Sequence, residues 1–244
     1  MMSSTSPSST DPQDITKRIF CYGDSLSAGT SPPYDQLFPY GPHLEKELNE
    51  NLYKSNNKSV VVRWRGLPGW TSSAMVEYIN DTNFGLQPVL DGISNPSLSL
   101  VIILAGTNDI GGLTSSMTSN TDNNVDVSLA VEPIIKLHQE CLDCIDTDTN
   151  TGSNQNIHTL AIGIPSSAWQ IMNPTAARLC NDMNIALQNF AKEHEERVTY
   201  VDFPFDYEQG GVNWSGDGLH FSPEGYETLG RSLAPYVKKI LDGM

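Results

Sequence analysis

Four short polar segments of this sequence contain residue types that could together supply a nucleophile, a base and hydrogen-bond donors. The first reads Gly23-Asp24-Ser25-Leu26 and directly follows an apolar run at residues 19–22. A serine on a turn between a strand and a helix exposes its hydroxyl, and flanking glycines permit a tight turn. Ser25 is therefore a candidate nucleophile, and its backbone N–H is a candidate donor to a substrate oxygen.

The last of the four segments supplies a candidate general base. Asp217 and His220 lie three residues apart, just before a helix-like run at residues 222–241. The carboxylate can hold one imidazole nitrogen, so that the other nitrogen faces outward as a base. A lone histidine is more often a packing residue, but the acidic partner and the loop location favour a catalytic role for His220.

The two middle segments offer donors to a developing negative charge. Gly69 follows Pro68 in a turn after the apolar run at residues 59–65, and its N–H could approach a ligand closely. Asn108 follows the most apolar run, and its side-chain NH₂ is a neutral donor that suits a transition-state oxyanion. For the neighbouring carboxylates of Asp24 and Asp109 we expect a role in bracing these turns.

These segments follow predicted strands. Short apolar runs predict strands at residues 19–22, 59–65, 98–105, 158–164 and 198–201. Apolar residues at helical spacing predict helices at residues 42–52, 72–78, 132–145, 174–195 and 222–241. The alternation indicates a three-layer α/β/α domain with a five-stranded parallel sheet. Residues 111–124 and 147–156 are rich in Ser, Thr, Asn and Gly and are predicted loops, of which the first could shape the site.

Composition limits the function classes. The chain of 244 residues is expected to form one domain at residues 15–244 after a disordered, Ser/Thr/Pro-rich tail at residues 1–14. A net charge of −15 disfavours nucleic acid and anionic lipid as partners. The absence of a long apolar run predicts no stable membrane insertion. The N-terminus does not read as a secretory signal, so we expect a cytoplasmic protein unless a signal has been removed. The oligomeric state stays open.

Cysteine and histidine usage predicts no metal site. Cys141 and Cys144 form a C-x-x-C pair inside a helix-like run, but a second pair at metal-binding spacing is missing. These cysteines, like Cys21 and Cys180, are expected to be thiols, most of them buried. The remaining histidines have no acidic partner in a motif, and His138 shares an apolar helix stripe that predicts a packing role.

The four segments together resemble the motif blocks of the GDSL/SGNH hydrolase family, in order and spacing, over roughly residues 18–241. The resemblance implies a flavodoxin-like sheet of strand order 2-1-3-4-5 and ester hydrolysis without a cofactor. It implies Ser25 as nucleophile, His220 as base and Asp217 as the residue that orients His220. The backbone N–H groups of Ser25 and Gly69 and the side chain of Asn108 would form the oxyanion hole. Trp70 departs from the family pattern, in which a small polar or acidic residue is common, and would reshape the pocket beside Gly69.

The sequence therefore predicts a serine esterase that forms an acyl-enzyme on Ser25. Its expected substrates are small molecules with short-chain or soluble acyl groups, such as acetylated sugars and aryl or alkyl esters. Hydrolysis of lysophospholipids or thioesters, and acyl transfer, stay open because the fold does not choose among them. A non-catalytic binding module is an alternative of another class, and a two-metal phosphoesterase is disfavoured because only one histidine lies in a motif. Four residues could line a substrate pocket or pack in the core: Trp70, Trp169, Met172 and Trp214.

Overall fold

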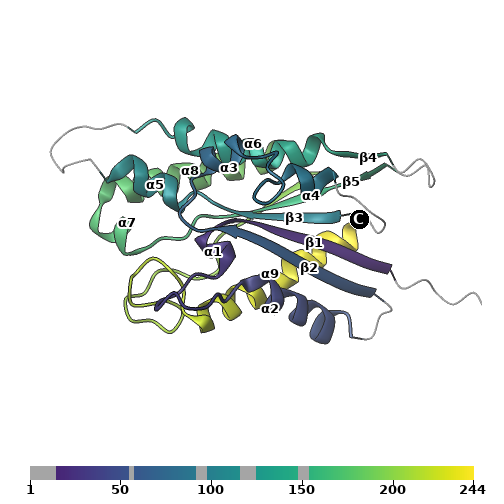
Figure 1. Cartoon of the computed structure of the whole chain (residues 1–244), viewed down its shortest axis with the longest axis horizontal. Helices are drawn as coiled ribbons and strands as arrows, with labels where there is room; N and C mark the ends of the chain where they lie inside the picture. Colours follow the sequence, from purple (N-terminus) through teal and green to yellow (C-terminus); the bar gives the residue numbers. More distant parts are fainter. Residues whose placement is uncertain (1–14, 55–57, 92–97, 116–124, 148–153) are drawn as a thin grey trace, which may run out of the picture.

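The structure is a computed structural model, and it describes residues 15–54, 58–91, 98–115, 125–147 and 154–244. The predicted tail at residues 1–14 lies outside the described residues. A five-stranded sheet crosses the centre of the molecule (Figure 1). Its strands are β1 (Ile15–Asp24), β2 (Lys58–Leu67), β3 (Leu98–Leu104), β6 (His158–Ile162) and β7 (Val198–Val201).

The sheet has the strand order β2-β1-β3-β6-β7, and every neighbouring pair is parallel. Counted along the chain, this is the order 2-1-3-4-5, so the predicted flavodoxin-like fold class is confirmed. Parallel strands place all their carboxyl ends at one edge, where ligands bind in open sheets of this kind. The edge that carries these ends is on the left in Figure 1, close to α1 (Ser25–Ala28).

Helices cover both faces of the sheet, which makes three layers (Figure 1). On one face lie α2 (Tyr40–Glu47), which continues as the π-helical turn η1 (Leu48–Leu52), and α9 (Pro223–Gly243). The other face is covered by α3 (Ser72–Glu77), α4 (Gln87–Asp91), α6 (Ser128–Asp143) and α8 (Pro174–Glu193).

The central strand β3 explains why both faces need a cover. Successive side chains of a strand point to opposite faces. Leu100 and Ile102 are buried in the core cluster beneath α2 and α9, whereas Val101 and Ile103 are buried in the cluster beneath α6 and α8. The run that the sequence shows as apolar on both faces is therefore buried on both faces.

The structure corrects the two predicted loops. Residues 107–114 form α5 (Thr107–Thr114), so a loop prediction that begins at residue 111 is wrong for its first four residues. Gly111 and Gly112 have low helix propensity, but the buried Ile110 anchors the helix. The predicted loop at residues 147–156 ends in a short hairpin of β4 (Ile145–Thr147) and β5 (Asn154–Asn156). Residues 116–124 and 148–153 lie outside the described residues.

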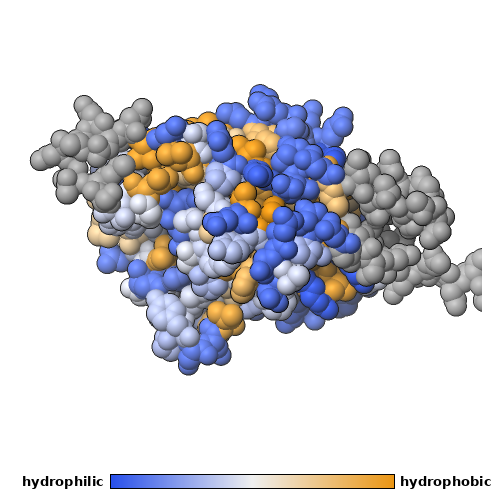
Figure 2. All heavy atoms as spheres, turned by 45° about the horizontal axis from the view of Figure 1, so that its top comes forward, coloured by the Kyte–Doolittle hydropathy of each residue, from blue (hydrophilic) through white to orange (hydrophobic). Residues whose placement is uncertain are grey.

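The molecular surface is mostly hydrophilic on the face turned forward in Figure 2, with hydrophobic residues gathered in separate places. Within the described residues no helix is both long and apolar enough to span a membrane.

Candidate active site

Ser25 is placed at the carboxyl edge of the sheet by the junction of β1 and α1. Asp24 ends the strand and caps the helix, because its Oδ1 accepts a hydrogen bond from the backbone N–H of Leu26 at 2.9 Å. Burial raises the pKa of this fully buried carboxyl to about 7, against the lowering effect of the Leu26 N–H. The predicted bracing role of Asp24 is therefore confirmed. Ser25 is the first helical residue, so its N–H has no acceptor within the helix.

His220 joins the candidate nucleophile Ser25 to a carboxylate. Its Nε2 lies 3.1 Å from Oγ of Ser25, across 195 residues of sequence, and its Nδ1 lies 2.7 Å from Oδ2 of Asp217. The carboxylate favours the tautomer that carries its proton on Nδ1, which leaves Nε2 as an acceptor for the Ser25 proton. The structure thus brings Ser25, His220 and Asp217 into one hydrogen-bonded chain.

Asp217 is itself held in place by its own loop. Its Oδ1 accepts hydrogen bonds from Ser215 Oγ at 2.7 Å and from the backbone N–H groups of Leu219 and His220, both at 2.9 Å. Partial burial acts to raise the pKa of Asp217, but the hydrogen bonds from His220, Leu219 and Ser215 outweigh burial and hold that pKa well below its usual range. Asp217 is therefore a carboxylate at neutral pH.

Two donors of the predicted oxyanion hole follow the carboxyl ends of β2 and β3, Gly69 in a turn and Asn108 in α5. Gly69 has a φ of 80°, and Trp70 N–H donates to the Leu67 carbonyl at 3.1 Å, as in a type II turn. Asn108, at the start of α5, donates from Nδ2 to the Trp70 carbonyl at 2.9 Å. A side-chain amide has two N–H groups, so this contact orients the amide and leaves one N–H for a ligand.

A buried contact links the start of α3 to the first turn of α5. Asp109 accepts hydrogen bonds from Ser72 through the backbone N–H, at 2.9 Å to Oδ2, and through Oγ, at 2.7 Å to Oδ1. Asp109 is 4% exposed, and burial raises its pKa against the lowering effect of the Ser72 donors. The predicted bracing role of Asp109 is confirmed, since this contact fixes Asn108 relative to the turn at Gly69.

Comparison with known proteins identifies the family of this chain. A model of the "GDSL-like Lipase/Acylhydrolase family" matches residues 21–228, which is most of the chain. The chain belongs to this family. The predicted enzyme class, a carboxylic ester hydrolase, is therefore confirmed. The search of curated proteins finds no match.

Solved structures resemble this GDSL-like chain in fold. An aryl esterase from M. smegmatis is 19% identical at a TM-score of 0.63, and the alignment covers 92% of this chain and 99% of that one. A carbohydrate acetylesterase from Sinorhizobium meliloti is 18% identical at a TM-score of 0.61, with the same coverage of 92% and 99%. A lipase/acylhydrolase from Enterococcus faecalis is 20% identical at a TM-score of 0.56, covering 91% and 96%.

The four residues proposed for a substrate pocket take different places in this GDSL-like structure. Trp214 is 6% exposed and packs in an aromatic cluster with Phe221, and its Nε1 donates to the Asp206 carbonyl at 2.9 Å. This position favours the core alternative for Trp214. The ring of Trp70 is half-buried and packs against the rings of Tyr78 and Phe84.

The other two lie on α7 (Ala168–Met172), beside the loop that carries Asp217. The N–H of Ala168 donates to the Gly218 carbonyl at 2.9 Å. Trp169 is half-buried, and its Nε1 donates to Oγ1 of Thr114 at 2.8 Å, so α7 is tied to α5. Met172 is 70% exposed at the end of the helix and directs most of its surface to solvent.

Tyr34 contacts Asp217 in the site, and the sequence did not predict this contact. It lies in the loop between α1 and α2, and its hydroxyl donates to Oδ2 of Asp217 at 2.9 Å, across 183 residues. The segment Ser31-Pro32-Pro33-Tyr34 contains no motif that would have pointed to this contact.

The histidine and thiol groups outside the site have packing roles. His138 is fully buried, its Nδ1 lies 3.0 Å from Oγ1 of Thr159, and burial lowers its pKa to about 3. Cys21, Cys141 and Cys180 are buried thiols. Cys144 is half-buried, and its Sγ lies 3.8 Å from the Leu90 carbonyl oxygen. Across the residues that the structure describes, no group of His, Cys, Asp and Glu could hold a metal ion.

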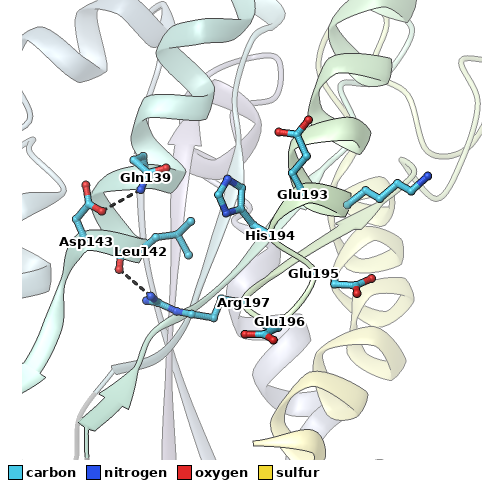
Figure 3. A pocket seen from close by; sticks show the side chains of 9 residues that line it. Gln139, Leu142, Asp143, Glu193, His194, Glu195, Glu196 and Arg197 are labelled. Carbon is cyan, nitrogen blue, oxygen red and sulfur yellow. Dashed lines mark hydrogen bonds between the residues drawn. The ribbon is translucent and has the colours of Figure 1, made fainter.

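A hollow of about 470 Å³ lies at the opposite edge of the sheet, between the carboxyl ends of α6 and α8 (Figure 3). Its lining contains charged side chains such as Asp143 and Glu193 but no serine, threonine or cysteine. Arg197 donates from Nη1 to the Leu142 carbonyl at 2.7 Å and thereby caps the carboxyl end of α6. The residues that line this hollow therefore offer no serine, threonine or cysteine nucleophile for acyl transfer.

Proposed function

We propose that this protein hydrolyses carboxylic esters through an acyl-enzyme on Ser25. The observation that carries the proposal is the continuous chain of contacts from Ser25 Oγ through His220 to Asp217, at 3.1 Å and 2.7 Å. A nucleophile within reach of a base, with the base oriented by a third group, is the arrangement that activates a serine hydroxyl.

In the first half of the reaction, Ser25 Oγ attacks the ester carbonyl carbon while His220 Nε2 takes the hydroxyl proton. The carbonyl oxygen becomes an oxyanion, which the N–H groups of Ser25, Gly69 and Asn108 stabilise. The tetrahedral intermediate then breaks its bond to the alcohol oxygen, and the protonated His220 gives its proton to the leaving alcohol.

In the second half, a water molecule attacks the acyl-enzyme. His220 takes one proton of the water. The second tetrahedral intermediate then breaks its bond to Ser25 Oγ and releases the acid, while the protonated His220 returns the proton to Ser25 Oγ. Asp217, a carboxylate at neutral pH, stabilises the imidazolium that forms in both halves.

For the substrate class we propose short-chain or soluble esters, including aryl esters and acetylated sugars. A Cβ placed on Gly69 would meet nothing within 4 Å, so the space beside this donor is open. The names of two fold relatives, an aryl esterase and a carbohydrate acetylesterase, describe substrates of the same class.

The test compares the wild type with Ser25→Ala and His220→Ala on p-nitrophenyl acetate, butyrate and octanoate, acetylated sugars, a lysophospholipid and a thioester. We expect turnover of the short esters by the wild type and its loss in both variants, with Ser232→Ala on α9 as the matched control. An alkyl phosphonate should label Ser25 in the wild type, which mass spectrometry detects. Wild-type rates in either variant would sink the assignment, and an optimum on octanoate or lysophospholipid would overturn the substrate class.

A further inference from the structure

The carboxylate of Asp217 accepts one hydrogen bond from a residue outside its own loop, the loop that also carries His220. Oδ1 is occupied by the donors of its own loop, whereas Oδ2 accepts from two partners. These partners are Nδ1 of His220 at 2.7 Å and the hydroxyl of Tyr34 at 2.9 Å. The two donors therefore share one oxygen.

The loop of Tyr34 aims this side chain at the site. Tyr34 has a φ of 67°, an uncommon conformation for a residue other than glycine. Its N–H donates to the Ser31 carbonyl at 2.8 Å, and the loop is closed at its base by a bridge between Thr30 and Leu37. The Tyr34 ring lies edge-on to the His220 ring, with centroids 6.0 Å apart. Since Tyr34 is 59% exposed, core packing does not account for this placement.

We propose that Tyr34 is a positioning residue of the active site, which acts on His220 through Asp217. The inference rests on the proposed function of Ser25, His220 and Asp217. By donating to Oδ2, the Tyr34 hydroxyl withdraws charge from the oxygen that His220 also contacts. A less basic carboxylate stabilises the protonated imidazole of His220 less. The Tyr34 hydroxyl thereby favours the neutral form of His220, which can accept a proton.

The Tyr34 hydroxyl carries its proton, and so can donate, over the pH range in which the proposed reaction would run. The hydrogen bond to Asp217 raises the pKa of Tyr34, so the hydroxyl keeps its proton at and above neutral pH. Other titratable groups near the site are Asp24 at the start of α1, and Tyr226 on α9, whose hydroxyl donates to the Thr30 carbonyl. Tyr207 also faces the loop of Asp217, because a Cβ on Gly218 would lie 3.1 Å from its hydroxyl oxygen.

The test is Tyr34→Phe, which removes the hydroxyl and keeps the ring. We expect the acidic limb of the kcat/KM profile to move up by about 0.3–1 pH unit, and kcat to fall about two- to tenfold, as the loss of one hydrogen bond of ordinary net strength at an exposed side chain would give. NMR titration of the His220 ring should show the same upward shift and needs no turnover. Tyr34→Ala should shift the NMR midpoint in the same direction, and Tyr236→Phe, on an exposed part of α9, should change neither profile.

An NMR midpoint in Tyr34→Phe equal to that of the wild type overturns the proposal, even if kcat falls, because a merely structural role would lower kcat alone. A downward shift overturns it as well. Because the NMR midpoint is independent of catalysis, an inactive wild type would refute the proposed function and still leave Tyr34 under test. An active wild type with an unshifted Tyr34→Phe would refute the role of Tyr34 alone.

Discussion

Replacing Asp217 by asparagine keeps the shape of the side chain but exchanges one acceptor oxygen for an NH₂ donor. The carboxylate accepts hydrogen bonds at both oxygens, two at Oδ2 and three at Oδ1. An amide accepts at only one of these positions. Turning its NH₂ toward Oδ1 would oppose three donors, so the less costly orientation places the NH₂ at Oδ2, facing His220 and Tyr34.

In that orientation the amide donates to Nδ1 of His220 and so selects the tautomer that carries its proton on Nε2. Because Nε2 faces Ser25 Oγ at 3.1 Å, this tautomer cannot take the serine proton. In serine proteases the equivalent change lowers kcat by about 10⁴, which corresponds to about 5 kcal/mol of transition-state stabilisation. We expect a loss of this size in Asp217→Asn.

The assay is kcat on p-nitrophenyl acetate at neutral pH, with circular dichroism to establish that the variant is folded. Asp182→Asn, on an exposed turn of α8, is the matched control and should retain wild-type turnover. If folded Asp217→Asn kept more than a tenth of the wild-type kcat, against the expected loss of about 10⁴, Asp217 would not orient the base and the reasoning would fail.

Two further predictions follow from named contacts. Asn108→Ala removes a donor from the proposed oxyanion hole and should lower kcat about 10²–10³-fold, whereas the control Asn181→Ala on α8 should leave kcat unchanged. If Asn108→Ala raised KM by this factor and left kcat constant, Asn108 would not act on the transition state. The pKa of His138 is about 3 in the folded chain and 6.5 in the unfolded chain, so between these pH values the unfolded chain binds a proton that the folded chain does not. The free energy of unfolding therefore falls as pH falls from 6.5 towards 3, by up to about 1.4 kcal/mol per pH unit. His138→Leu should make this dependence on pH less steep. Urea unfolding at several pH values measures this slope, and an unchanged slope in His138→Leu would show that the buried imidazole does not produce it.

The sequence determined the layers of this protein and the residue types of its site. The run at residues 98–105 is apolar on successive positions, which predicts a strand covered on both sides, and β3 is buried on both faces. The order of the four polar segments predicted that Ser25, Gly69, Asn108 and His220 lie at one sheet edge. Such features are local or periodic, so they can be read without coordinates.

Tertiary structure decided which atoms meet. The contact of Asp217 Oδ2 with Tyr34 joins two loops from distant parts of the chain, and the contact of Asp109 with Ser72 joins α5 to α3. Trp214 is a core residue because its ring packs in the aromatic cluster around Phe221. Residues 111–114 became helical through the packing of α5, against their glycine content. Side-chain partnerships between distant loops depend on how each loop closes over the folded core, and no periodicity of the sequence encodes that geometry.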